Sequence, residues 1–223
     1  MPLATPSRGI EELVDETSGR EVVEAPPVVD RFVELREKYE QFLVGDAVEW
    51  ILENIHDVLL PSDINLFLQQ TREYEDNSGY HLHTGDFISK LIHNSYDAGH
   101  SDFELDVRSL KPIDSLSFGV SWTKERMVKV IITGQVGRWF GYGAQYSTFT
   151  LGETGDRCGA LAYNSTFTIG KAGVLCGHDA RHSIFKTHSK SQYERFKSSI
   201  EQKIGNTIYL LSSDGSILNG GPW

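Results

Sequence analysis

The distribution of apolar residues divides the chain into three stretches. Between Val29 and about Asn77, apolar side chains recur at helical spacing, three or four positions apart. From residue 78 onward this period gives way to glycine, serine, threonine and aromatic residues, a composition typical of strands and turns. Residues 1–28 contain few large apolar side chains. The pattern therefore predicts a disordered or loosely attached arm over 1–28, an acidic helical unit over 29–77 and a β domain over 78–223.

An 18-residue repeat lies inside the β domain. Three consecutive segments, 134–151, 152–169 and 170–187, align without a gap, and six columns are identical in all three. One column is alanine and one is serine. The glycine and phenylalanine columns are Gly134, Gly137, Gly141, Gly152, Gly155, Gly159, Gly170, Gly173, Gly177, Phe149, Phe167 and Phe185. A weaker copy covers 88–105, residues 106–133 form an insertion, and 188–223 form a C-terminal cap that begins with a helix.

The repeated columns have a structural explanation. A unit of 18 residues cannot bury its own apolar face, whereas stacked copies can. Alternation within Ser-Thr-Phe-Thr-Leu directs serine, phenylalanine and leucine to one face, so the phenylalanine column predicts an interior stack. The glycine columns are expected to supply positive φ or close backbone approach where the chain bends.

The pattern G-x-x-G-x-x-x-G-x-x-A-x-x-S-x-F resembles the GXGXG repeat. That repeat occurs in the C-terminal domain of the glutamate synthase large subunit and in one of the subunits of formylmethanofuran dehydrogenase. The resemblance covers 134–187 clearly and implies a right-handed parallel β-helix that serves as a scaffold for catalytic domains. We therefore predict a mainly β fold with α: a short right-handed parallel β-helix with an N-terminal helical unit and a C-terminal capping helix. No glutaminase, flavin or iron–sulfur signature accompanies the repeats, so neither activity is implied.

Charge and composition narrow the possible partners. Residues 1–75 contain 17 acidic and 6 basic residues, while the rest of the chain is nearly neutral, with 14 and 15. This balance argues against nucleic acid as a partner. The acidic helical unit is either a solvated surface or a docking surface for a basic partner. Without an 18-residue apolar run, a secretory signal or a cysteine framework, the chain is expected to be cytoplasmic and not bound to a membrane.

Two cysteines and two histidines are the candidates for metal chemistry. Cys158 and Cys176 share a column, which favours two buried thiols, with a disulfide or a metal pair as the alternatives. Cys176, His178 and His182 are weak candidates for metal ligands, since their spacing matches no known zinc motif.

Asp156, His178 and Asp179 are the candidates for acid–base chemistry on the repeat surface. No spacing selects a pair of carboxylates among them, so no catalytic residue is assigned and no cofactor is expected. The sequence favours a non-catalytic scaffold or interaction module that docks to itself or to a larger enzyme of redox or amidotransferase type. The alternative is a carbohydrate-active hydrolase or lyase with a groove around these three residues.

Overall fold

The structure is a computed structural model that describes residues 31–45, 52–117, 122–200 and 204–222. The arm predicted over 1–28 lies outside these residues. From Phe32 onward the described residues belong to one compact unit, so the helices and the strands share a core. The helices are α1 (Val33–Val44), α3 (Pro61–Gln70), α4 (Tyr80–Asp97) and α5 (Lys190–Ser199), with a short 3-10 helix, η1 (Thr71–Tyr74), after α3.

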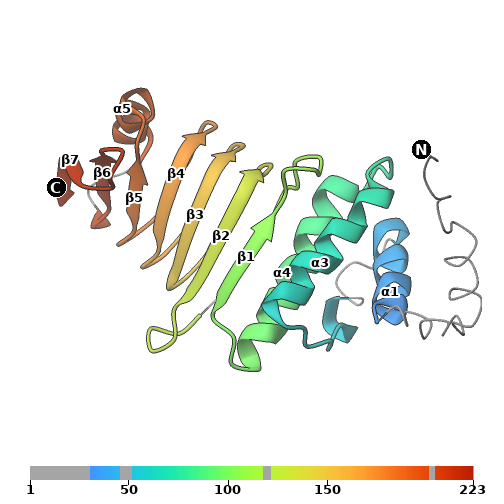
Figure 1. Cartoon of the computed structure of the whole chain (residues 1–223). Coiled ribbons are helices and arrows are strands. Elements are labelled where there is room, and N and C mark those ends of the chain that lie inside the picture. Colours follow the sequence, from blue (N-terminus) through green and yellow to red (C-terminus); the bar gives the residue numbers. More distant parts are fainter. Residues whose placement is uncertain (1–30, 46–51, 118–121, 201–203, 223) are drawn as a thin grey trace, which may run out of the picture. The chain divides into compact units, whose positions relative to one another are not determined.

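Seven strands of the described residues form one sheet in chain order (Figure 1). They are β1 (Asp102–Asp106), β2 (Val128–Gln135), β3 (Ser147–Thr154), β4 (Thr166–Ala172), β5 (Ile184–Thr187), β6 (Thr207–Leu211) and β7 (Ile217–Pro222). Neighbours from β1 to β6 are parallel, and β7 is antiparallel to β6. Phe149 pairs with Phe167, and Phe167 with Phe185, so strand partners in the repeats are 18 residues apart.

The predicted fold class is wrong. The structure is α/β, with a single, mostly parallel sheet and flanking helices, and not a mainly β right-handed β-helix. Each repeat contributes one strand to this sheet, and its glycine-rich half forms turns. Each repeat leaves the sheet after one strand for a local reason. Trp139, Arg157 and Leu175, at equivalent positions, have φ between +57° and +60°. A residue in this left-handed region cannot continue a strand.

Helices α1, α3 and α4 lie on the β1 side of the sheet, where α3 packs beside β1, whereas α5 packs near β5 and β6 (Figure 1). The Asn65 side chain accepts a hydrogen bond of 2.8 Å from the backbone N–H of Asp106, and the Gln69 amide donates to the Asp106 carbonyl. These contacts satisfy backbone groups that an open edge would leave to solvent.

Helix α4 occupies the first part of the weak copy predicted over 88–105. Phe87, Ile88, Leu91 and Ile92 are fully buried at helical spacing, and only the end of the copy forms a strand, β1. Helical periodicity over four buried positions therefore prevails over the faint match to the repeat.

The phenylalanine column is the centre of the core. The Phe149 and Phe167 ring centroids are 5.0 Å apart, those of Phe167 and Phe185 are 5.1 Å apart, and both pairs are stacked. Phe196 of α5 closes the column with an edge contact on Phe185. All four side chains are fully buried, so the column extends from β3 to the C-terminal helix.

Two of the glycine columns have different physical causes. Gly159 has a φ of +62°, which favours glycine because it has no Cβ. Gly155 has no positive φ, but a Cβ at this position would lie 2.9 Å from the carbonyl group of Gly137 in the preceding repeat. Positive φ and close backbone approach are thus both present, in separate columns.

Phe167→Ala is expected to lower the free energy of unfolding by about 3–5 kcal/mol, because it removes the ring that lies between two others and leaves a cavity. Urea denaturation of the wild type and the variant measures the difference. An unchanged denaturation midpoint would contradict the assignment of this column as the centre of the core.

Gly155→Ala is expected to destabilise the protein by roughly 1–3 kcal/mol, because the added methyl group overlaps the backbone of Gly137. Gly221→Ala is the matched control, since nothing lies within 4 Å of a Cβ at that position. Thermal denaturation followed by circular dichroism compares the two. Equal melting temperatures would show that the turns are not packed this closely.

Candidate functional site

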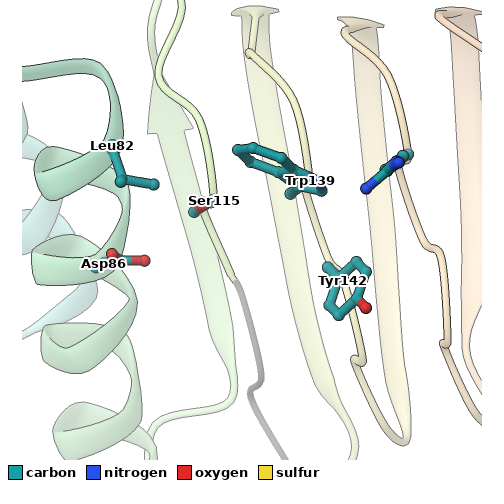
Figure 2. Close-up of a pocket in the computed structure, with 6 residues that line it drawn as sticks. Leu82, Asp86, Ser115, Trp139 and Tyr142 are labelled. Carbon is teal, nitrogen blue, oxygen red and sulfur yellow. The ribbon is translucent and has the colours of Figure 1, made fainter.

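A pocket of about 340 Å³ lies between helix α4 and the turns of the repeats (Figure 2). Leu82 and Asp86 project into it from α4. On the other side it is bordered by Ser115, which precedes β2, and by the turn residues Trp139, Tyr142 and Arg157. The pocket therefore joins the helical part of the chain to the repeats.

The turn side of the pocket is a ladder of equivalent positions. Ser115, Trp139 and Arg157 each have a φ near +60°. The backbone N–H groups of these three residues donate to the carbonyls of Arg138, Asp156 and Val174, at 2.8, 2.9 and 2.8 Å. Repetition of one backbone geometry therefore places three different side chains side by side at the pocket.

Close packing of α4 brings Asp86 to this ladder. A Cβ at Gly85 would overlap the carbonyl oxygen of Asp114, so only glycine allows the helix to lie so near. One turn further along, the Ser89 hydroxyl accepts a 2.7 Å hydrogen bond from the N–H of Ser117. These two contacts fix the helix against residues 114–117 and direct Asp86 toward Ser115 (Figure 2).

Asp86 has unusual electrostatics. No other described residue makes a hydrogen bond or an ion pair with its carboxylate, and burial raises its pKa to about 6. Its neighbours Phe87 and Ile88 are fully buried. At neutral pH the protein therefore keeps a half-buried negative charge without a counter-ion in the described part of the chain, a condition that is common at binding and catalytic sites.

The structure gives Asp156 a structural role. Its Oδ1 accepts a 2.9 Å hydrogen bond from the N–H of Val174 in the next repeat, and its carboxylate lies directly over Gly173. Asp114 does the same one turn earlier, accepting a 2.6 Å bond from the N–H of Arg138. Both aspartates satisfy a backbone donor of a neighbouring turn.

The other two acid–base candidates lie at the surface. His178 and Asp179 form an ion pair of 3.3 Å, and each side chain is 51% exposed. Neither residue lines the pocket at Asp86, nor does Asp156. The structure therefore does not assemble Asp156, His178 and Asp179 into one enclosed site.

The three metal candidates are also separated. Cys176 is buried beside Cys158; burial, followed by the hydrogen bond that its S–H donates to that neighbour, raises the pKa of its thiol. Both cysteines are free thiols. His182 is exposed and packs edge-on against Tyr163, with ring centroids 5.7 Å apart. Among the residues that the structure describes, no three His, Cys, Asp or Glu side chains are placed to hold a metal ion.

Exposed apolar side chains gather on the turns that follow β3 and β4. Leu161, Tyr163, Val174 and Leu175 are 46%, 38%, 57% and 39% exposed. The guanidinium groups of Arg157 and Arg181, on the same turns, have no ion pair with any described residue. We name these six residues the turn face. It adjoins the pocket, because Arg157 belongs to both.

Comparison of the chain with protein-family models, curated proteins and solved structures finds no match. None of the described helices is long and apolar enough to cross a membrane.

Sequence reasoning missed Asp86, Leu82 and Ser115. A single aspartate in an amphipathic helix carries no motif, and its position at the pocket depends on the contact between Gly85 and Asp114, 29 positions later. The available signal was Gly85 itself, since a glycine inside a helical pattern frequently marks close packing.

Asp86→Asn is expected to raise the free energy of unfolding at pH 7.5 by about 1–2 kcal/mol, a value reduced for partial exposure of the carboxylate. The folded-state pKa of about 6 lies above the ordinary value of 3.8, so the charged form opposes folding. The wild type therefore loses stability relative to the variant as pH rises from about 4 to 6.

Urea denaturation at pH 4 and pH 7.5 tests this expectation. The gain in the free energy of unfolding should be present at pH 7.5 and much smaller at pH 4, where the aspartic acid is neutral in the folded state and little more than half ionised in the unfolded one. Asp97→Asn, at the exposed end of the same helix, is the control and should not reproduce the pattern. A loss of stability on Asp86→Asn at pH 7.5 would reveal an attractive partner for the carboxylate.

Proposed function

We propose that the protein is a non-catalytic interaction module that docks a partner protein through the turn face. One observation carries this proposal: the buried alanine, serine and phenylalanine columns are identical in the three repeats, whereas the exposed turn columns differ from repeat to repeat. The positions equivalent to Trp139 hold Arg157 and Leu175, and those equivalent to Gly143 hold Leu161 and Asp179. Varied side chains on a repeated backbone are typical of binding surfaces in repeat proteins.

The composition of the turn face supports a protein partner. Tyrosine and arginine contribute disproportionately to binding energy at protein interfaces. Leu161, Val174 and Leu175 add apolar surface that gains free energy when it is removed from water. By contrast, the outer side of β3 and β4 presents threonines such as Thr150 and Thr168, so the two sides of the repeats differ in character.

Charge selects the kind of partner. Arg157 and Arg181 have no counter-ion among the described residues, whereas the exposed Asp179 carboxylate, at the position equivalent to Leu161, lies 3.3 Å from the Nε2 of His178. A twofold contact that paired the turn face with itself would place four arginines of two copies in one interface, where like charges repel. We therefore infer an acidic and apolar segment of another protein as the occupant.

The positions of three residues place this function above the hydrolase or lyase alternative. A carbohydrate-active enzyme would need a groove at Asp156, His178 and Asp179, but Asp156 is held by a backbone donor and the other two pair with each other at the surface.

Site-specific photocrosslinking tests the proposal. We would place benzoylphenylalanine at Leu175 on the turn face and, as a matched control, at Thr168 on the outer side of β4, in the full chain and in its own host cells. We expect a crosslinked protein from position 175 and not from position 168, with the crosslink mapped to an acidic, apolar segment. Arg157→Glu combined with Arg181→Glu should weaken binding of the purified partner at least tenfold.

Three results would overturn the proposal. They are equal adducts from both positions, adducts only with a second copy of the chain, and no adduct from position 175. A partner whose affinity is unchanged by the two arginine substitutions would show that charge does not select it.

A further inference from the structure

The pocket beside the turn face is built for a different kind of ligand. We propose that it binds a small zwitterion, with an ammonium group at Asp86, an apolar body against Trp139 and Tyr142, and a carboxylate at Arg157. This proposal does not rest on docking of a partner protein at the turn face.

The end of the pocket that would hold the ammonium group is marked by Asp86, whose carboxylate has no partner among the described residues. The Asp86 carboxylate lines the pocket and makes no hydrogen bond or ion pair with them. Lys90, one turn further along α4, has no ion pair within 4 Å in the described part of the chain. His83, one turn before Asp86 on the helix, makes no ion pair with it either, so both basic side chains within one turn leave the carboxylate free. Its half-buried charge, with a pKa raised to about 6 by burial, is best compensated by a ligand cation that donates hydrogen bonds.

Aromatic rings form the next part of the pocket. Figure 2 shows Leu82 and Asp86 directed from α4 toward Trp139, with Ser115 between them and Tyr142 nearby. Indole and phenol rings favour both an apolar body and an adjacent ammonium group, the latter through the negative face of the ring. A volume of about 340 Å³ is at the small end of ligand pockets, so the ligand is of the size of an amino acid and not of a nucleotide.

The anion end follows from a comparison of two arginines. Arg138 is held by Asp114, with an ion pair of 3.1 Å, and its guanidinium lies 4.8 Å from the Trp139 ring centroid. Arg157 also lines the pocket, but its guanidinium has no partner among the described residues. A planar, permanently charged guanidinium is suited to bidentate binding of a carboxylate. Arg157 is therefore the group that is available to a ligand anion.

Three probes that share one phenyl ring measure the contributions of the ammonium and carboxylate groups to binding separately. They are 4-(aminomethyl)benzoate as the zwitterion, whose ammonium and carboxylate groups lie at opposite ends of the ring, benzylamine as the cation and benzoate as the anion. Binding to the full chain at pH 7.5 is measured by isothermal titration calorimetry and by thermal shift. We expect the zwitterion to bind at least tenfold more tightly than the amine, and the anion to bind most weakly.

Two variants assign the charged ends. Asp86→Asn, which we expect to fold with increased stability, should weaken both amine-containing probes at least tenfold. Arg157→Gln should remove the advantage of 4-(aminomethyl)benzoate over benzylamine and leave benzylamine binding unchanged. Asp97→Asn on the same helix and Arg181→Gln on the turn face are matched controls that should change nothing.

The proposal would be overturned by equal affinities for the three probes, by no binding of any probe at 5 mM, or by equal effects of the control variants. Failure of the photocrosslinking experiment would not bear on this result, because position 175 does not line the pocket.

Discussion

The stacking of Phe149, Phe167 and Phe185 at the spacing of adjacent strands is the constraint on which the other features of the repeats depend. Parallel strands lie about 4.8 Å apart, and rings held at 5.0 and 5.1 Å match this distance. Within the three repeats each chain segment returns to the sheet after 18 residues, and the turns repeat the same conformation. Between β5 and β6 the strand partners Phe185 and Ile208 lie 23 positions apart, because α5 is inserted outside the sheet. A regular core therefore dictates a regular backbone on the opposite side of the repeat.

A regular backbone explains why polar residues in the turns differ so much in role. Asp114 and Asp156 have the same chemistry as Asp86, but each accepts a hydrogen bond from an N–H of the next turn. They are part of the ladder that keeps the turns in register. Asp86 belongs to α4, outside that ladder, and satisfies no backbone group in the described part of the chain. The distinction between a structural and a functional aspartate thus depends on which backbone donor lies within reach, and residue type alone does not decide it.

The sequence predicted what depends on local repetition and little of what depends on contacts between distant segments. Identical letters at 18-residue intervals implied the pairing of Phe149 with Phe167, and the structure has that pairing. The fold class was predicted wrongly because the left-handed conformation of Trp139, Arg157 and Leu175 is not encoded by glycine at those positions. At two of these positions, Trp139 and Arg157, the backbone N–H donates a hydrogen bond to the following turn, which periodicity does not reveal. The pocket was missed for the same reason, since Asp86 meets it only through the packing of Gly85 on Asp114.

The lack of a counter-ion for Asp86 among the described residues follows from how the ladder uses its arginines. Arg138 directly precedes Trp139 in the chain. Its guanidinium donates two hydrogen bonds to the Asp114 carboxylate, and its backbone N–H donates a third. The same contact supports residues 114–117, against which α4 packs, so Arg138 cannot turn to Asp86 without loosening the helix that carries Asp86. An uncompensated carboxylate lowers stability at neutral pH. A substitution as small as aspartate to asparagine would remove that cost without a change in shape. The charge is therefore best explained by an interaction with a group outside the described residues, and the rings and the guanidinium of Arg157 line the pocket where that group would lie.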